Sequence, residues 1–120
     1  MPSRKRSLDA LIEDIEKWIG VGQEAVGGMS IDVFSATCLA FHTGSWCIVC
    51  VGEAAGQILK HYPDFPDQYL REELLLANAA RNRIAHGYYD LDEDQVWKTL
   101  KVSFTMLSEK LASRKDRNVR

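Results

Sequence analysis

The sequence predicts an all-α protein, an antiparallel bundle of four to five helices. Apolar residues recur at helical spacing, and no segment alternates apolar and polar residues for long enough to indicate a strand. The turns between the helical segments are short, which favours antiparallel neighbours. At 120 residues the chain is expected to form a single domain, with flexible basic ends at about 1–6 and 113–120.

The first helix is predicted to run from Leu8 to about Gly20 or somewhat beyond. Ser7 precedes it as an N-cap, and the apolar residues that follow share one face. Glycines at 20, 22, 27 and 28 then indicate a loosened connection. Ser30 marks a fresh helix start, and the segment His42–Ser45 predicts a break before the next helix.

The next predicted helix, from residue 45 to about residue 62, is apolar nearly all round, which is typical of a buried helix. Gly52 and Gly56 lie four residues apart on it, so a neighbouring helix has room to approach. Pro63 and Pro66 end this helix and start another, because proline fits a first helical turn but not a helix interior.

The last helix is predicted from Asp92 to about Ala112. Asp92 and Gln95 form a possible capping box, with Leu91 and Val96 placed as a hydrophobic staple. The helix before it carries the chemistry-bearing residues discussed below.

Charge and cysteine content restrict the setting in which the protein works. The net charge is -2, but residues 1–6 carry +3 and residues 110–120 carry +4, which leaves -9 for the middle. Basic groups that converge in space can still bind a polyanion. No run approaches the roughly 18 apolar residues of a membrane helix, and the basic N-terminus lacks a signal-type apolar run. With three cysteines, an odd number, we expect a cytoplasmic protein without a membrane association.

Residues 81–88, RNRIAHGY, place a cation, an imidazole and a phenol near one helix end. Arg81 lies on the same stripe as Leu70, Leu74, Ala77 and Ile84, so its guanidinium is aimed at the core. A buried charge needs a partner, which is either an internal carboxylate such as Glu53 or an external anion.

The neighbouring shoulder of the same helix carries Asn78, Asn82 and His86 at four-residue intervals. Gly87 is predicted as a left-handed C-cap, which places His86 beside the helix end, where the dipole favours its protonated form. Such a histidine is either a structural cap or a group that transfers protons near neutral pH.

Arginine and histidine together indicate RNA cleavage without a metal ion. The guanidinium can bind a phosphate, and the imidazole can take a proton from a ribose 2′-hydroxyl or give one to the leaving oxygen. On an ideal helix Arg81 and His86 point about 140° apart. One copy therefore forms a loose site, and two copies across a twofold axis would tighten it.

Two blocks of the sequence carry a resemblance to a known family. The first is GEAA at 52–55, followed by YPDFP at 62–66; the second contains Arg81-Asn82, His86 and Tyr88, followed by Asp92 and Val96-Trp97. Over about residues 30–112 the chain resembles the HepT-like branch of the HEPN superfamily of small helical ribonuclease toxins. In this resemblance the stretch WCIVC at 46–50 departs from the family pattern by being more apolar.

The resemblance implies an all-helical, HEPN-like homodimer in which Arg81 and His86 of both subunits line an RNA-cutting cleft. Asn82, Asn78 and Glu53 are the expected supporting residues. It also implies a toxin–antitoxin system, in which a small nucleotidyltransferase antitoxin silences the toxin by transferring AMP to Tyr88. An adenylate there would repel RNA phosphate through its bulk and negative charge.

Other interpretations remain open at this point. The chain could be a non-catalytic nucleotide-binding or substrate-binding subunit of a nucleotidyltransferase complex, or a structural helical dimer. Cys38, His42, Cys47 and Cys50 could be read as zinc ligands, and WCIVC as a redox motif. We expect neither a metal nor a cofactor, because such a redox motif needs a βαβ setting and the zinc site would require two helices to bend together at Gly44.

Overall fold

The computed structural model describes residues 5–87 and 91–118, with side chains described as far as Arg114. Within these ranges the chain forms α1 (Leu8–Val26), α2 (Ile31–Ala36), α3 (Cys38–His61) and α4 (Gln68–Gly87). A last continuous helical segment follows, made of α5 (Glu93–Lys98), the π-helical turn η2 (Thr99–Ser103) and α6 (Phe104–Asn118). The predicted all-α bundle is confirmed as a compact five-helix fold.

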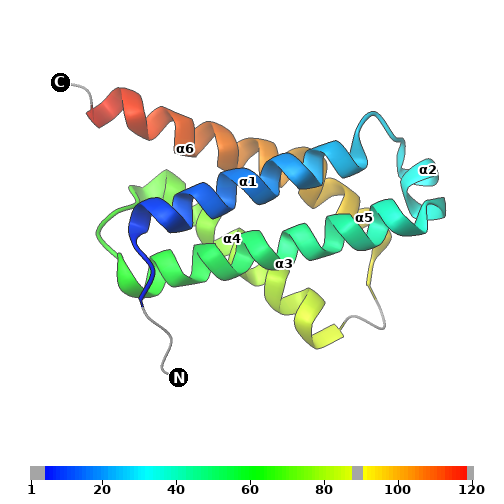
Figure 1. The fold of residues 1–120 in the computed structure, drawn as a ribbon, viewed down its shortest axis with the longest axis horizontal. Helices are drawn as coiled ribbons and strands as arrows, with labels where there is room; N and C mark the ends of the chain where they lie inside the picture. Colours follow the sequence, from blue (N-terminus) through cyan, green and yellow to red (C-terminus); the bar gives the residue numbers. More distant parts are fainter. Residues whose placement is uncertain (1–4, 88–90, 119–120) are drawn as a thin grey trace.

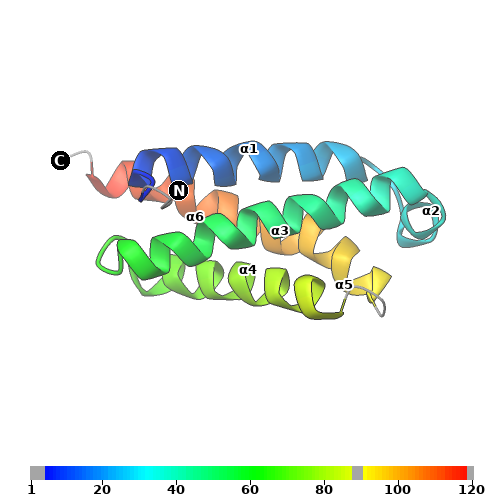
Figure 2. The ribbon, with the colours of Figure 1, turned by 60° about the horizontal axis from the view of Figure 1, so that its bottom comes forward.

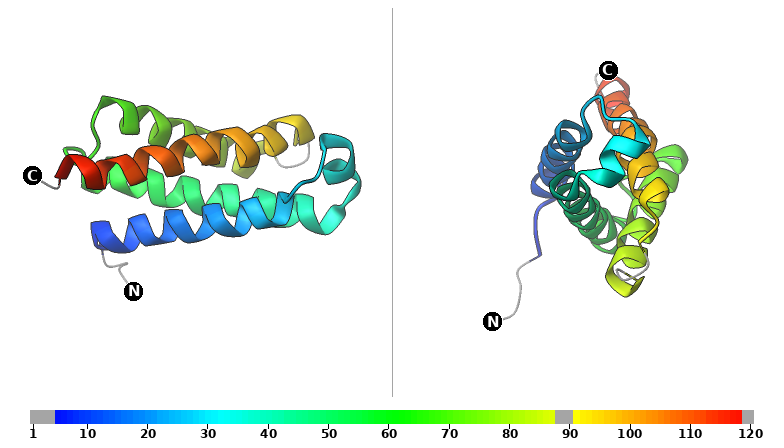
Figure 3. Two further views of the ribbon diagram at one scale, coloured as in Figure 1. Left: turned by 90° about the horizontal axis from the view of Figure 1, so that it is seen from above. Right: turned by 90° about the vertical axis from the view of Figure 1, so that its right-hand side faces the viewer.

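The long helices run antiparallel in chain order. α1 and α4 run in one direction, whereas α3 and the α5–α6 segment return in the other, and the short α2 lies across one end (Figure 1). α3 lies between α1 and α4 (Figure 2) and makes its most extensive contacts with these two helices. Seen end-on, the α5–α6 segment lies across the bundle from α3, where it contacts α1 and α4 and completes the bundle (Figure 3).

Short polar side chains start the helices, as the sequence predicted. The hydroxyl of Ser7 accepts a hydrogen bond from the Ala10 amide, and that of Ser30 accepts one from the Val33 amide. The Asp92 carboxylate accepts from the amides of Asp94 and Gln95. These bonds satisfy amides that have no partner within the first helical turn.

The start of α4 differs slightly from the prediction. Pro63 and Pro66 do separate α3 from α4, but Pro66 precedes the first helical turn rather than lying in it. Asp67 begins the helix instead, because its carboxylate accepts from the Leu70 amide at 2.8 Å.

One boundary based on glycine was partly right and one was wrong. α1 runs beyond Gly20 and through Gly22 to Val26, and it ends at Gly27, one of the glycines that marked the predicted connection. α3 continues through the predicted break at His42–Ser45, so the interruption lies at Thr37 instead. The hydroxyl of Ser45 bonds to the Phe41 carbonyl within the helix. Of the glycines at 20, 22 and 44, two are packing sites: a Cβ at Gly44 would lie 2.5 Å from Leu100 Cδ1, and one at Gly22 would lie 3.0 Å from Leu100 Cδ2, whereas one at Gly20 would meet no atom within 4 Å.

Leu100 belongs to the π-helical turn of the last helix, which the sequence did not predict. A π turn adds a residue to one helical turn and so changes the direction of the side chains that follow. Leu100 and Phe104 are buried, and both side chains pack against α1 at Gly22, where a Cβ would lie 3.0 Å from each. The last helix extends to Asn118, beyond the predicted end at about Ala112.

The predicted close approach at Gly52 and Gly56 is confirmed, and the helix that approaches is α4. A Cβ at Gly52 would lie 2.6 Å from the Ala77 carbonyl oxygen and closer still to Arg81 Cβ. A Cβ at Gly56 would lie 2.8 Å from the Asn78 amide oxygen. The two helices can cross at this distance only because α3 has no side chain at either position.

α3 is also long and apolar enough to cross a membrane by length and composition, with a mean hydropathy of 1.2 over its most apolar stretch. Half of that stretch is buried inside the bundle. Its fully buried residues, among them Cys47, Val51 and Ile58, pack into the core between the other helices. These features are those of the central core helix of a helical bundle.

We predict that Gly52→Ala destabilises the fold by about 1–3 kcal/mol or more, because the added methyl group overlaps the α4 backbone. Gly20→Ala is the matched control, since a Cβ at Gly20 meets no atom within 4 Å. That substitution should stabilise α1 by about 0.5–1 kcal/mol. Urea denaturation gives both free energies of unfolding, and equal values for the two variants would contradict the close crossing.

Candidate active site

The crossing of α3 and α4 determines where Arg81 lies. The stem of Arg81 packs against Gly52, and its guanidinium extends past the edge of α3 to Glu53, with Nη2 3.4 Å from Oε2. Gln57, one turn further along α3, donates to the other Glu53 oxygen at 3.3 Å. The predicted pairing of Arg81 with Glu53 is therefore confirmed, and it lies on the surface of α3 rather than inside the core.

The expectation that the Arg81 guanidinium points into the core was only partly right. Leu70 and Leu74 on the same stripe are buried, but the Arg81 side chain is 33% exposed and that of Glu53 is 54% exposed. The arginine stem lies between the helices and the charged end reaches solvent. An ion pair this exposed stabilises the fold by only about 0–1 kcal/mol.

The guanidinium of Arg81 has hydrogen-bonding capacity that the described residues leave unused. Nη1 donates to the Asn82 amide oxygen at 3.0 Å. Nε is buried and has no hydrogen-bond partner within residues 5–87 and 91–118. Since a guanidinium carries five N–H donors, the site can accept an anion at Arg81 in addition to, or in place of, Glu53.

His86 lies on the last turn of α4 and is exposed. α4 stays helical through Gly87, and Gly27 is the only glycine among the described residues with a positive φ, so the predicted left-handed C-cap at Gly87 was wrong. Because the helix does not unwind before Gly87, Arg81 and His86 keep the offset of about 140° of a regular helix. Within the described chain, no hydrogen bond or ion pair joins His86 to Arg81 or Glu53.

The three residues predicted to lie along one shoulder of α4, Asn78, Asn82 and His86, have different surroundings. Asn78 is partly buried, with its amide against Gly56 of α3, whereas Asn82 is exposed and bonded to Arg81. The structure thus brings Arg81, Asn82 and Glu53 together, with Asn78 packed one turn away, and leaves His86 apart. Tyr88 lies outside the described residues.

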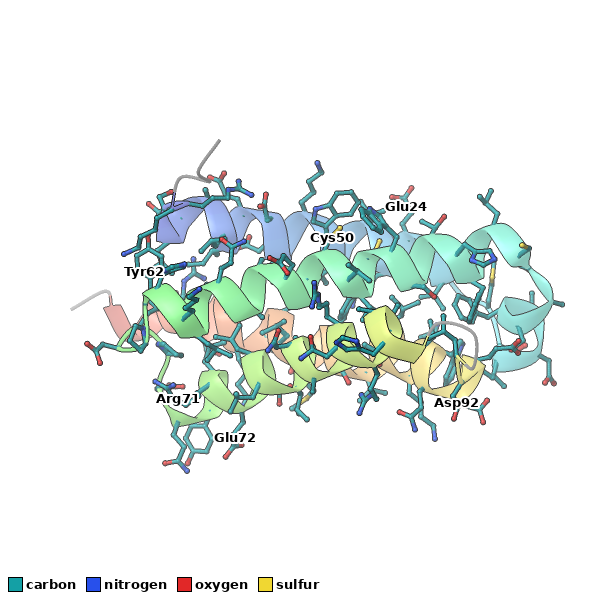
Figure 4. All side chains as sticks on the ribbon, turned by 90° about the horizontal axis from the view of Figure 1, so that it is seen from below. Glu24, Cys50, Tyr62, Arg71, Glu72 and Asp92 are labelled. Carbon is teal, nitrogen blue, oxygen red and sulfur yellow. The ribbon has the colours of Figure 1, made fainter. Side chains whose placement is uncertain are left out.

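A groove opens beside Arg81 between α1 and α3, with a volume of about 370 Å³. The side chains of Trp18 on α1 and of Trp46 and Cys50 on α3 line it, and Glu53, Gln57 and Arg81 lie along its polar part. Cys50 lies midway along α3, next to α1 (Figure 4). Glu53 and Arg81 were expected site residues, but the groove and its tryptophans were not predicted from the sequence, although Trp46, Cys50, Glu53 and Gln57 recur at helical spacing on one face of α3.

A basic cavity of about 540 Å³ adjoins this groove and shares Arg6, Glu53 and Gln57 with it. Lys5, Arg6 and Lys60 supply its cationic lining, and His61 lies beside them. The first described residues are held there by Tyr62, whose hydroxyl donates to the Arg6 carbonyl at 2.7 Å and whose ring lies 4.6 Å from Lys5 Nζ. Arg6 also pairs with Asp14 of α1.

The cysteines lie in three different environments and none is paired. Cys38 is exposed, Cys50 is partly buried, and Cys47 is fully buried. Burial, together with the nearby Cys50, raises the pKa of Cys47 to about 11, and burial and the charge of Asp14 raise the pKa of Cys50. No three His, Cys, Asp or Glu side chains in the described part of the chain are grouped to hold a metal ion.

Residues 9–113 match the family model of HepT-like ribonucleases. The chain belongs to the HepT-like ribonuclease family. The match extends the resemblance seen over residues 30–112 to include α1, and family membership implies ribonuclease activity, an RNA substrate and a toxin–antitoxin partner. No curated protein and no solved structure matches this HepT-like chain.

We predict that the three thiols of this HepT-like protein differ in reactivity. The thiolate is the nucleophile, so a raised pKa lowers the reactive fraction at pH 8, and burial blocks access. Iodoacetamide should alkylate Cys38 first and Cys50 more slowly, and it should reach Cys47 only after unfolding in urea. Peptide mass spectrometry over time measures the three rates, and fast labelling of Cys47 in the folded protein would contradict its burial.

Proposed function

We propose that this HepT-like chain is the toxin of a toxin–antitoxin pair, a metal-independent endoribonuclease that works in the cytoplasm as a homodimer. Family membership supports the ribonuclease class. The arrangement at Arg81 carries the assignment of residues, because the α3–α4 crossing holds its guanidinium at the rim of a groove, and Nη1 and Nη2 have N–H donors beyond those that face Asn82 and Glu53. Three unpaired cysteines suit a reducing compartment.

In this proposal Arg81 binds the scissile phosphate. Glu53 occupies the guanidinium in the free protein at a distance of 3.4 Å, and the exposure of both groups makes this a weak contact that a phosphate can replace. Asn82 keeps the guanidinium oriented through its bond to Nη1. Asn78 supports the site indirectly by packing against Gly56 of α3.

His86 transfers the proton. The 2′-oxygen attacks the phosphorus, the bond from phosphorus to the 5′-oxygen breaks, and the products are a 2′,3′-cyclic phosphate and a 5′-hydroxyl. A proton leaves the 2′-hydroxyl and another joins the 5′-oxygen, so His86 serves as base, as acid, or as both in turn. Arg81 stabilises the charge that develops on the phosphate oxygens.

Geometry supports a dimer as the working form. On the regular helix through Gly87, Arg81 and His86 of one copy diverge, so one chain does not present both groups to one phosphate. Leu75 is 51% exposed on the α4 stripe that continues through Ala79 and Asn82 to His86. A second copy packed there about a twofold axis would cover this apolar surface and bring His86 of each copy towards Arg81 of the other.

Silencing is proposed to occur at Tyr88, two residues after His86 in the sequence. A nucleotidyltransferase partner would transfer AMP from ATP to the phenol oxygen and release pyrophosphate. The added phosphate carries a negative charge two positions from His86 in the sequence, which opposes the binding of RNA phosphate.

We predict that His86→Ala lowers the rate of RNA cleavage by about a hundredfold or more, since acid–base catalysis contributes about 10²–10⁴-fold. His42→Ala is the matched control, because His42 is another exposed histidine and lies near the opposite end of α3 from the basic cavity. Cleavage of a labelled RNA is followed on denaturing gels, and circular dichroism checks the helical fold.

Equal cleavage by the His86→Ala and His42→Ala variants would remove His86 from the mechanism. RNA binding without cleavage by the unmodified protein would instead favour the alternative function, a substrate-binding subunit of a nucleotidyltransferase complex.

We predict that incubation with the cognate nucleotidyltransferase and ATP adds AMP to the protein, and that Tyr88→Phe prevents it. Intact-mass spectrometry measures the addition, and cleavage assays on the same samples should show loss of activity only where AMP is attached. Tyr69→Phe, which removes an exposed hydroxyl at the other end of α4, is the control and should still be modified. Adenylation that persists in Tyr88→Phe would move the acceptor to another residue.

A further inference from the structure

Trp46 is an exposed tryptophan that the proposed chemistry does not use. It is 58% exposed on α3, in the apolar stretch WCIVC at 46–50. In contrast, Trp97 is partly buried, and its indole nitrogen donates to the Met29 carbonyl. Exposing an indole forgoes much of the hydrophobic stabilisation that its burial would give, so this position favours a ligand that covers the ring.

The groove that Trp46 lines has both apolar and charged walls. Trp18, Trp46 and Val49 are among its apolar residues, and its charged residues are Arg6, Asp14, Glu53 and Arg81. A volume of about 370 Å³ falls in the range of sites for small organic groups. An aromatic wall next to a guanidinium with free donors matches the two halves of a nucleotide, whose base stacks and whose phosphate accepts hydrogen bonds.

The register of α3 and α4 relates Trp46 to the proposed catalytic residues. The helices are antiparallel and cross where Gly52 meets Arg81. Residues that precede Gly52 on α3 therefore lie level with residues that follow Arg81 on α4. Trp46 is six positions before Gly52 and His86 is five positions after Arg81, so the two lie at the same level of the bundle.

We propose that Trp46 is a stacking surface for an unpaired base beside the scissile phosphate, so that the substrate is single-stranded RNA. This inference rests on the proposed ribonuclease function of the same site. If a base stacks on Trp46 and its phosphate binds Arg81, the ribose between them lies, along the bundle axis, between Arg81 and His86. Bases within a duplex are stacked on each other, so they cannot lie on the indole.

The adjoining basic cavity indicates that the groove beside Trp46 binds a nucleic acid rather than a second protein chain. The groove leads past Arg81 to Lys5, Arg6 and Lys60, which would face the next phosphates of a strand that continues along α3. Even with the carboxylate of Glu53 in the same lining, the cavity is net positive, so charge complementarity with a polyanion extends beyond the stacking surface.

The test measures binding in a His86→Ala background, so that RNA is not cut. Trp46→Ala should weaken the Kd for a fluorescent single-stranded RNA by about ten- to a hundredfold. Trp46→Phe should restore most of the affinity, because a phenyl ring also stacks. Leu39→Ala is the matched control, since Leu39 is another exposed apolar residue of α3 and lies outside the groove; it should not change the Kd.

Two further measurements separate stacking from a general structural effect. Trp46→Ala removes no charge, so the slope of log Kd against log salt concentration should stay unchanged, whereas Arg81→Ala should reduce it. Binding of a fully paired RNA duplex should be the same with and without Trp46. Equal Kd values for Trp46→Ala and Leu39→Ala, or an equal loss for duplex and single strand, would overturn the proposal.

Sedimentation analysis of each variant tests the competing occupant, a second copy of this chain. A change from dimer to monomer in Trp46→Ala would place the indole in the dimer interface and overturn the stacking role. Failure of the ribonuclease proposal gives a different result, because the binding measurements use uncut RNA. Loss of the stacking effect with normal cleavage overturns only this inference, and a Trp46-dependent Kd without cleavage overturns only the catalytic proposal.

Discussion

The close crossing of α3 and α4 is the constraint on which the candidate site depends. Two helix backbones normally stand apart by the thickness of their side chains, but at Gly52 and Gly56 the α3 surface consists of backbone alone. α4 fills that space with the stem of Arg81 and the amide of Asn78. The arginine is fixed near its Cβ, which lets the guanidinium reach past α3 to the groove that α1 forms with α3.

This crossing also explains why a charged residue can lie on the packed stripe of α4. Burial of the whole guanidinium would require a strong internal partner. Here the carbon stem supplies the packing, and the charged end meets Glu53 at the surface, where the ion pair adds little stability. A weak partner suits a binding site, because little free energy is lost when another anion takes its place. Structural packing and the proposed binding of phosphate therefore fall to two different parts of one side chain.

The sequence predicted the helix starts well and the glycine positions less well. Ser7, Ser30 and Asp92 start helices through bonds to amides one turn away, so local sequence is sufficient to recognise them. Glycine has two opposite meanings in a helix, as a terminator and as a contact point. Gly44 was predicted to break the helix but lies within it. It is a contact point, because Leu100, more than fifty positions away in the chain, occupies the space where a side chain at Gly44 would be.

The sequence by itself determined the all-α class and the four main helices, and it offered Glu53 as a partner for Arg81, because helical periodicity, caps and the need of a charge for a partner are local or chemical properties. Only the tertiary structure decided that the arginine reaches solvent and that Trp18 and Trp46 share a groove with it. It also decided that Lys5 and Arg6 join Lys60 beside that groove. These relations depend on how helices distant in sequence cross, and a crossing is set by the shapes of both surfaces together.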